Sequence, residues 1–481
     1  MFLSPTRCRW RWQPVGLILV CLVVSRTASA DKIDDYVRQQ MRLRHIPGLS
    51  LAVVQDGKII KAKGYGLANV ELNSPAAPDT VYQLASLTKQ FTATTIMLLV
   101  QDGKISVEDK ISSYVDGTPD SWKEITLRHL LTHTSGLKDY LDEAPDSPNS
   151  AVKSHEETTP EKIVQSMVGR PLDFAPGEKY TYSNTNYLLL SMVVRRAGGK
   201  PYDQFLAERV FQPLGMTATR LTSHEEVIPN RAAGYTWTGT RWRNSAALNP
   251  TLWDNGDGGM LSTVLDLAKW DAALYGETIL TAASKQQMWT PLTLNDGKTG
   301  SYGFGWGIGD TKGHPRVWHT GGRPGTSTAI FRYLDDRLTI IVLANQDNTR
   351  CVEMANRLAS FYVPAFAPTV YRAIRDTEPQ VKDRVRKLMD GFAQGKDIAE
   401  LLPPGIPVGV SGFPDPINSS KSLYENLRRL GPVRSCNLVE RKEDGDSTLY
   451  RYELTYRDAR LLVDFRLNKE NKIVRQAFQI E

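Results

Sequence analysis

A serine and a lysine, Ser86 and Lys89, stand at the start of an apolar run that continues through Leu99 to Gly103. Residues at i and i+3 share one face of a helix, so this spacing predicts that the hydroxyl and the amine meet. A serine hydroxyl becomes a good nucleophile when a neighbouring base takes its proton, and an amine can do so once its surroundings lower its pKa. The pair is therefore a candidate nucleophile and base. The alternative is a serine near a helix N-cap followed by a solvated lysine.

The first 30 residues have the pattern of a secretory signal peptide. Three arginines precede an apolar run over residues 15–24, and Ala28-Ser29-Ala30 is a small-residue cleavage site. The run is shorter than the roughly 20 apolar residues that span a bilayer, so no stable membrane anchor is expected. We therefore predict an exported protein, periplasmic or extracellular, whose mature chain begins at residue 31.

Most of the basic charge belongs to the predicted leader. Residues 1–30 carry four arginines and no acidic residue, so their removal lowers the formal net charge from +6 to +2. No run of Lys and Arg interleaved with aromatic residues is present, and a nucleic-acid partner is not expected. Two cysteines remain in the mature chain, Cys351 and Cys436. An exported chain could oxidise them to a disulfide or keep them as two buried thiols.

A chain of 481 residues exceeds one ordinary hydrophobic core, so two domains are expected after the leader. The character of the sequence changes around residues 363–368, which places the domains at 31–365 and 366–481. In the second domain, a helical pattern near Val381–Ala393 and four runs of alternating polarity predict a small α+β unit with a one-sided antiparallel sheet. No catalytic set is visible there.

Apolar strand patterns occur near both ends of the first predicted domain. Residues 49–54 and 58–65 flank Asp56-Gly57, and such a turn between apolar runs predicts a hairpin. Residues 329–334 and 338–344 predict a second hairpin. Helical patterns occupy much of the sequence between them.

A second polar constellation is Tyr182-Ser183-Asn184, delivered by the Pro176-Gly177 turn ahead of an amphipathic helix. Tyr182 is a candidate acid or base, because a phenol near a cationic lysine has its ionised form favoured. Asn184 offers an amide donor and an acceptor for a peptide group. A turn with a capping asparagine is the alternative interpretation.

A third constellation is His319-Thr320-Gly321-Gly322, which precedes the second apolar hairpin. A strand edge rich in glycine lets a substrate backbone approach closely, with the Gly322 N–H directed into a cleft. His319 and Thr320 are candidate donors for a carboxylate.

Two other segments have weaker signals. His129 and His133 stand at i and i+4, but no third ligand is near in sequence, so we interpret them as residues that brace a loop after a helix ending at Gly136. The glycine-dense segment 254–263 lacks the Walker pattern, which favours close backbone packing near a cleft over a phosphate site.

Three motifs in a fixed order, Ser86-Leu-Thr-Lys89, Tyr182-Ser-Asn184 and His319-Thr-Gly321, resemble those of the serine β-lactamase and penicillin-recognising DD-peptidase superfamily. The segments Leu130–Gly136 and Gly258–Thr263 add to the match. The resemblance covers roughly residues 31–365 and is closest to the class C-like branch. It implies an antiparallel sheet, built from the first and last strands of the domain, beside a helical region, with a cleft between them.

By this resemblance, Ser86 attacks an acyl carbon to form a covalent acyl-enzyme, and Lys89 with Tyr182 moves the proton, with either one as the base. The backbone N–H groups of Ser86 and Gly322 correspond to the oxyanion hole. The implied substrate-binding residues are Asn184, His319, Thr320 and Gly321. Residues 366–481 resemble small cystatin-like or NTF2-like accessory domains.

The third motif begins with His319, as it does in some DD-carboxypeptidases, D-amino-acid peptidases and esterases of the superfamily. Many β-lactamases have lysine at this position. The histidine argues against efficient β-lactam resistance, and Asn184 favours amide substrates over simple esters. If His319 binds a carboxylate, recognition should strengthen as pH falls through about 6.5, where imidazole gains charge.

The sequence thus predicts an exported serine hydrolase that cleaves an amide or ester bond, acting on peptidoglycan peptides, D-amino-acid derivatives or β-lactams. A promiscuous carboxylesterase of the same fold is one alternative. A non-catalytic binding or assembly module is another, but it predicts loss of Ser86, Lys89 or Tyr182, and all three are present. No spacing implies a metal or an organic cofactor. The expected partner is a small-molecule or peptide substrate, including cell-wall peptides, and the oligomeric state is left open.

Overall fold

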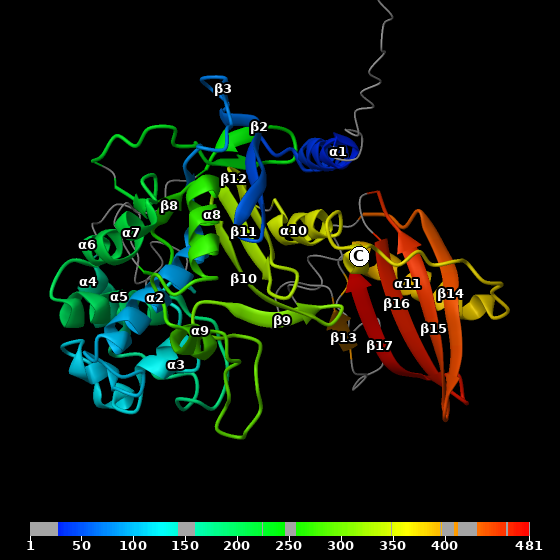
Figure 1. Cartoon of the computed structure of the whole chain (residues 1–481). Coiled ribbons are helices and arrows are strands. Elements are labelled where there is room, and N and C mark those ends of the chain that lie inside the picture. Colours follow the sequence, from blue (N-terminus) through cyan, green and yellow to red (C-terminus); the bar gives the residue numbers. More distant parts are fainter. Residues whose placement is uncertain are drawn as a thin grey trace, which may run out of the picture.

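The computed structural model describes residues 27–142, 159–223, 225–245, 256–347, 349–394, 396, 408–411, 431–457 and 460–480. Its larger part is built on a seven-stranded antiparallel sheet with the order β3-β2-β1-β12-β11-β10-β9 (Figure 1). The strands are β1 (Gly48–Gln55), β2 (Lys58–Asn69), β3 (Ser74–Pro75), β9 (Gly307–Thr311), β10 (His314–Arg323), β11 (Thr326–Tyr333) and β12 (Leu338–Ala344).

The first and last strands of this part lie side by side in the centre of the sheet. β1 pairs with β12, so that Leu51 lies opposite Val342 although 291 positions separate them in the chain. The β1–β2 hairpin turns at Asp56 (φ +52°) and Gly57 (φ +72°), both left-handed, as a two-residue turn of this type requires. The predicted α+β fold class and the arrangement of its sheet are confirmed.

Helices cover both faces of the sheet. Leu51 and Val53 of β1 pack with α1 (Thr27–Arg44) and α10 (Cys351–Ala359) in one buried cluster. Ala52 and Val54 of the same strand pack in a second cluster with the helical region. The strand is continuously apolar because both of its faces are buried.

The helical region is organised around α2 (Thr88–Gln101), whose residues from Thr88 to Leu99 are all buried. α2 contacts α5, α6 and α9. An apolar helix without a polar face belongs in the middle of a domain, and Lys89 is the one charged residue in its sequence. The remaining helices of this region are α3 (Leu127–Leu131), α4 (Pro160–Met167), α5 (Asn184–Gly198), α6 (Tyr202–Leu206), α7 (Gln212–Leu214), α8 (Val264–Ala273) and α9 (Ala282–Met288).

Short elements complete this part of the molecule. Three strands form a small antiparallel sheet in the order β4-β8-β5, and two more form a separate ribbon. Their bounds are β4 (Tyr82–Gln83), β5 (Arg220–Leu221), β8 (Met260–Ser262), β6 (Tyr235–Trp237) and β7 (Trp242–Asn244). A 3₁₀ turn, η1 (Ala85–Leu87), joins β4 to α2.

The C-terminal part is a separate sheet packed on one helix (Figure 1). Val385 and Phe392 of the helix pack against Tyr452, Val463 and Phe478 of the sheet. The four predicted strands form antiparallel pairs in the order β17-β16-β15-β14, and a further strand, β13, adds in parallel to β17. The elements are α11 (Pro379–Ala393), β13 (Val408–Ser411), β14 (Ser435–Asp444), β15 (Ser447–Thr455), β16 (Arg460–Asn468) and β17 (Ile473–Ile480).

The strand β13 was not predicted, because its glycine and the neighbouring prolines favour a loop.

Cys351 on α10 and Cys436 on β14 are free, buried thiols, which decides between the disulfide and the two free thiols that the sequence left open. Most of the predicted leader lies outside the described residues, so it stays a prediction, as do the domain limits. Among the described residues, no helix is both long enough and apolar enough to cross a membrane.

Candidate active site

Ser86 lies in the tight turn η1, directly before α2. The preceding residue, Ala85, has a φ of +49°, a left-handed conformation that costs about 1–2 kcal/mol for a residue with a Cβ. Hydrogen bonds hold the turn: the Leu84 N–H donates to the Met260 carbonyl (2.8 Å), and the Thr88 hydroxyl donates to the Ala85 carbonyl (2.7 Å). Strand β8 thus holds the turn in place through its pairing with β4. Ser86 is partly exposed at the start of the buried helix α2. Nothing in the sequence marks Ala85 as strained.

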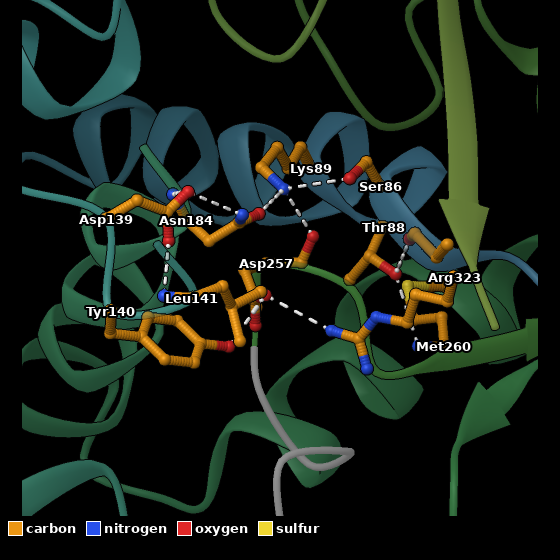
Figure 2. A network of polar contacts seen from close by, with 12 residues as sticks. Ser86, Thr88, Lys89, Asp139, Tyr140, Leu141, Asn184, Asp257, Met260 and Arg323 are labelled. Carbon is orange, nitrogen blue, oxygen red and sulfur yellow. Dashed lines mark hydrogen bonds and ion pairs between the residues drawn. The ribbon is translucent and has the colours of Figure 1, made fainter. Parts of the chain in front are cut away.

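Lys89 lies beside Ser86, with its Nζ 3.1 Å from the Ser86 Oγ (Figure 2). The amine also donates to the Asn184 Oδ1 (2.8 Å) and to the Asp257 backbone carbonyl (2.6 Å). Both of these oxygens can only accept. A neutral amine has two N–H groups and one lone pair, so two donated hydrogen bonds leave the lone pair for the Ser86 hydroxyl. The predicted meeting of Ser86 and Lys89 is confirmed in this geometry.

Burial sets the protonation of Lys89. The side chain is 0% exposed, and this desolvation lowers the pKa of Lys89 to about 7. The negative charges of Asp257 and Asp139 act in the opposite direction, and the positive charge of Arg323 acts with burial. A large share of the amine is therefore neutral near pH 7 and able to accept a proton.

Tyr182 lies beside this pair, with its hydroxyl hydrogen-bonded to that of Ser86. Its ring is 4.9 Å from the Lys89 Nζ and packs on the His133 ring at a centroid distance of 4.2 Å. Burial raises the pKa of Tyr182 well above its usual value. The expectation that Lys89 favours the ionised phenol is therefore wrong, because loss of solvent on burial outweighs the interactions that favour the ionised form, such as the hydrogen bond with Ser86. Tyr182 is a neutral phenol at physiological pH.

Asn184 links Lys89 to a carboxylate that sequence reasoning missed. The Asn184 Nδ2 donates to the Asp139 Oδ2 (2.8 Å), and the Asn184 backbone N–H donates to the same oxygen (3.0 Å). Burial raises the pKa of Asp139 from its ordinary value. The Asn184 amide keeps one N–H and one lone pair for another partner. Asp139 follows the Leu130–Gly136 segment, and that adjacency is the one sequence signal that could have pointed to it.

His319 on β10 is buried and fully hydrogen-bonded. Its Nδ1 lies 2.7 Å from the Thr320 carbonyl, which can only accept, so this nitrogen carries the hydrogen. Its Nε2 lies 2.8 Å from the Tyr302 hydroxyl and therefore accepts from it. Burial is the main cause that lowers the pKa of His319 to about 3, and the positive charge of the nearby Lys89 adds to it. The expected gain of charge near pH 6.5 is therefore wrong. His319 has no free donor here, and its role in substrate binding stays a prediction.

The edge of β10 that follows His319 faces the Ser86 turn. Pairing with β9 ends at Trp318, and the remainder of β10 contacts η1 instead. At Gly321, a Cβ would lie 2.1 Å from the Leu84 carbonyl oxygen, so only glycine permits this approach. Gly322 is exposed, with open space where its Cβ would be. This arrangement suits the predicted oxyanion position of Gly322, and Thr320 lies partly exposed on the same edge.

An ion pair between Asp257 and Arg323 lies beside Lys89 (Figure 2). The Asp257 Oδ2 accepts from the Arg323 Nη2 (3.1 Å) and from the Tyr140 hydroxyl (3.0 Å). Gly258 permits the contact, since a Cβ there would lie 2.4 Å from the Arg323 Nη2. The described part of the predicted glycine-dense segment therefore packs closely beside the site, as expected; residues 254 and 255 lie outside the described residues.

The two histidines at i and i+4 are structural. The His129 Nδ1 accepts from the Thr126 N–H at the start of α3, and the His133 Nδ1 accepts from the Ser183 N–H (3.2 Å each). The bracing interpretation is confirmed, although α3 ends at Leu131 and not at Gly136. Within the described ranges, no group of three or more His, Cys, Asp or Glu side chains could hold a metal.

The chain is also similar to proteins of a known family. A beta-lactamase family model matches residues 33–362. The chain belongs to the beta-lactamase family. The beta-lactamase family is one of serine hydrolases, and the resemblance inferred from the three motifs is confirmed.

Individual relatives and solved structures are consistent with this family assignment. Penicillin-binding protein 4* of Bacillus subtilis is 34% identical over 367 residues, which are 73% of this chain and 79% of that protein. The D-amino acid amidase from Ochrobactrum anthropi SV3, solved with L-phenylalanine amide, is 26% identical with a TM-score of 0.60 over 70% of this chain and 98% of its own. The octameric penicillin-binding protein homologue from Pyrococcus abyssi shares the fold, with 21% identity and a TM-score of 0.60 over 92% and 96% of the two chains.

Proposed function

We propose that this chain is an exported serine hydrolase that cleaves an amide or ester bond through an acyl-enzyme on Ser86. The observation that carries the proposal is the position of Lys89. Its Nζ is 3.1 Å from the Ser86 Oγ, and its other two contacts are with acceptors alone. That arrangement directs a lone pair at the serine hydroxyl.

In the acylation step, the Ser86 Oγ forms a bond to the substrate carbonyl carbon while its proton moves to the Lys89 Nζ. The carbonyl oxygen becomes an oxyanion, for which the backbone N–H groups of Ser86 and Gly322 are the donors. Such donors contribute roughly 3 kcal/mol each to the transition state in comparable enzymes. Lys89 acts as the base because burial lowers its pKa to about 7, whereas the raised pKa of Tyr182 keeps the phenol protonated.

Collapse of the tetrahedral intermediate requires a proton on the leaving nitrogen or oxygen. Tyr182 supplies it, because its neutral hydroxyl is hydrogen-bonded to the attacking atom and so lies beside the bond that breaks. The proton taken up by Lys89 replaces the one that Tyr182 gives away. Water then attacks the acyl-enzyme by the same route in reverse and releases Ser86.

Amides and peptides of D-amino acids, including peptidoglycan peptides, are the proposed substrates. Similarity to a penicillin-binding protein at 34% identity and to a D-amino acid amidase at 26% identity supports this class. The Asn184 amide, with one N–H and one lone pair remaining, fits a substrate amide group. The N-terminal leader pattern supports action outside the cytoplasm.

The test is intact-protein mass spectrometry of the chain after exposure to a fluorescent penicillin. It is run beside Ser86→Ala and the matched control Ser113→Ala, an exposed serine in another turn. A penicilloyl adduct on the wild type and on Ser113→Ala, but not on Ser86→Ala, supports the proposal. Turnover of D-phenylalanine amide and of a p-nitrophenyl ester is measured on the same samples. Ester turnover alone assigns a carboxylesterase, and no adduct with no turnover contradicts the proposed function.

A further inference from the structure

The two acceptors that orient Lys89 are each held by one member of a dipeptide, Asp139-Tyr140 (Figure 2). Asp139 binds the side chain of Asn184 (2.8 Å), and Tyr140 binds the side chain of Asp257 (3.0 Å). Two neighbouring residues therefore bind the two residues that accept hydrogen bonds from Lys89. Neither belongs to the three motifs that carry the family resemblance.

We propose that Asp139 and Tyr140 are positioning residues, which fix both acceptors of Lys89 and thereby aim its lone pair at Ser86. The inference rests on the proposed function, since it concerns the base of that reaction. It assigns neither residue a contact with substrate.

Asp139 selects the orientation of the Asn184 amide. The Asp139 carboxylate is surrounded by N–H donors: the Asn184 Nδ2 and backbone N–H, and the Leu141 backbone N–H (3.0 Å). With Nδ2 turned to Asp139, Oδ1 faces Lys89 and accepts from it at 2.8 Å. The reversed amide would place two oxygens in contact at Asp139. It would also direct an N–H at the Lys89 amine, whose lone pair would then turn from Ser86.

Tyr140 places the second acceptor. Its buried hydroxyl, on a side chain 1% exposed, donates to the Asp257 Oδ2, and the backbone carbonyl of Asp257 receives the Lys89 amine at 2.6 Å. Tyr140 is itself fixed, because its backbone N–H donates to the Thr185 hydroxyl (3.0 Å) beside Asn184. The backbone of Tyr140 is thus held next to Asn184, the residue that Asp139 binds.

The charge of Asp139 provides a readout that separates positioning from general stability. Asp139 and Asp257 raise the pKa of Lys89, while burial and Arg323 lower it. Removing the Asp139 charge should therefore move the acid limb of kcat to lower pH. The titratable and charged groups that face Lys89 from the surrounding elements are Asp139, Tyr182, Tyr187, Asp257, Arg323, His133 and His319.

The experiment compares Asp139→Asn and Tyr140→Phe in the full-length chain, with a p-nitrophenyl ester and D-phenylalanine amide as probes. The matched controls are Asp109→Asn and Tyr114→Phe, which break a Tyr–Asp hydrogen bond (2.5 Å) that makes no contact with the site. Each site variant should lower kcat by about tenfold or more, with a smaller change in KM, as loss of one hydrogen bond predicts. The controls should stay within about twofold of the wild type.

Asp139→Asn should also shift the acid limb of kcat by about 0.5 pH unit or more toward lower pH. Tyr140→Phe should lower kcat without that shift, because it removes no charge. The fold-loss of kcat in the double variant should be smaller than the product of the two single-variant losses, since both residues act on one amine. Circular dichroism confirms that each variant is folded, and Tyr140→Phe tests the proposal by itself if Asp139→Asn does not fold.

Three outcomes separate the inference from the proposed function. Ser86-dependent turnover in the wild type, with kcat and the acid limb unchanged in both site variants, overturns the inference alone. A fall in kcat equal to that of the controls overturns it as well. Absence of any Ser86-dependent turnover in the wild type overturns the proposed function, and the inference with it.

Discussion

The Nζ of Lys89 lies 3.1 Å from the Oγ of Ser86, on a lysine side chain that solvent does not reach. This burial explains how the Lys89 amine can act as a base. Desolvation disfavours the ammonium form, and the pKa of Lys89 falls to about 7. The opposing charges of Asp257 and Arg323, paired at 3.1 Å, act on Lys89 in opposite directions and leave burial dominant.

The pH dependence of the reaction should follow Lys89. Below a pH of about 7 the amine is protonated and cannot accept the Ser86 proton, so kcat/KM should rise with pH through about 7 and then level off. No fall is expected below pH 10, because the pKa of Tyr182 is raised well above that value. The measurement is a pH profile of kcat/KM from pH 5 to 10 with a neutral ester substrate. A rate that increases as pH falls through 6.5 would contradict this assignment.

Tyr182→Phe should separate proton transfer from packing. The variant removes the hydroxyl that bonds Ser86 but keeps the ring against His133 at a centroid distance of 4.2 Å. We expect kcat for an amide to fall by about 100-fold, as for loss of a general acid, with little change in the melting temperature. Esters with good leaving groups need less protonation and should lose less. Equal losses for amide and activated ester would argue against a role in leaving-group protonation.

Two neighbouring glycines on β10 should differ sharply in how much an alanine substitution destabilises the protein. A Cβ at Gly321 would lie 2.1 Å from the Leu84 carbonyl oxygen and 2.2 Å from the Thr328 Oγ1, whereas a Cβ at Gly322 meets nothing within 4 Å. Gly321→Ala should lower the free energy of unfolding by about 3 kcal/mol, and Gly322→Ala by less than about 0.5 kcal/mol. Urea unfolding followed by circular dichroism measures both. Equal stability of the two variants would mean that β10 can move away from the Ser86 turn at little cost.

The buried imidazole of His319 should make the protein less stable in acid. Its folded-state pKa is lowered to about 3, whereas the unfolded chain titrates near 6.5. Between these values the unfolded state binds a proton that the folded state does not, so stability falls as pH falls from about 6.5 toward 3. The slope approaches about 1.4 kcal/mol per pH unit.

The measurement for this prediction is the free energy of unfolding of the wild type minus that of His319→Gln, at pH 7, 5.5 and 4.5. Glutamine keeps one donor and one acceptor for the Thr320 carbonyl and the Tyr302 hydroxyl but does not titrate. The difference should decrease steadily in acid. A difference that does not vary with pH would show that His319 protonates in the folded state near its ordinary pKa.

Much of the fold could be predicted from local pattern. The Asp56-Gly57 turn, the apolar run of α2 and the alternating strands of the C-terminal sheet all follow from periodicity and turn chemistry, which act over a few residues. Ser86 and Lys89 were found for the same reason, because one helical turn brings them together. The strand β13 was missed, since its pairing with β17 depends on residues more than sixty positions away.

The sequence by itself thus determined which chemical groups the site contains, the order of its three motifs and the family to which the chain belongs. Only the tertiary structure decided what those groups can do. Burial by distant segments lowers the pKa of Lys89 and raises that of Tyr182, and it leaves His319 neutral. Asp139 enters the site through a hydrogen bond to Asn184, 45 positions along the chain. Desolvation and such contacts depend on distances in space, which residue spacing in the sequence does not specify.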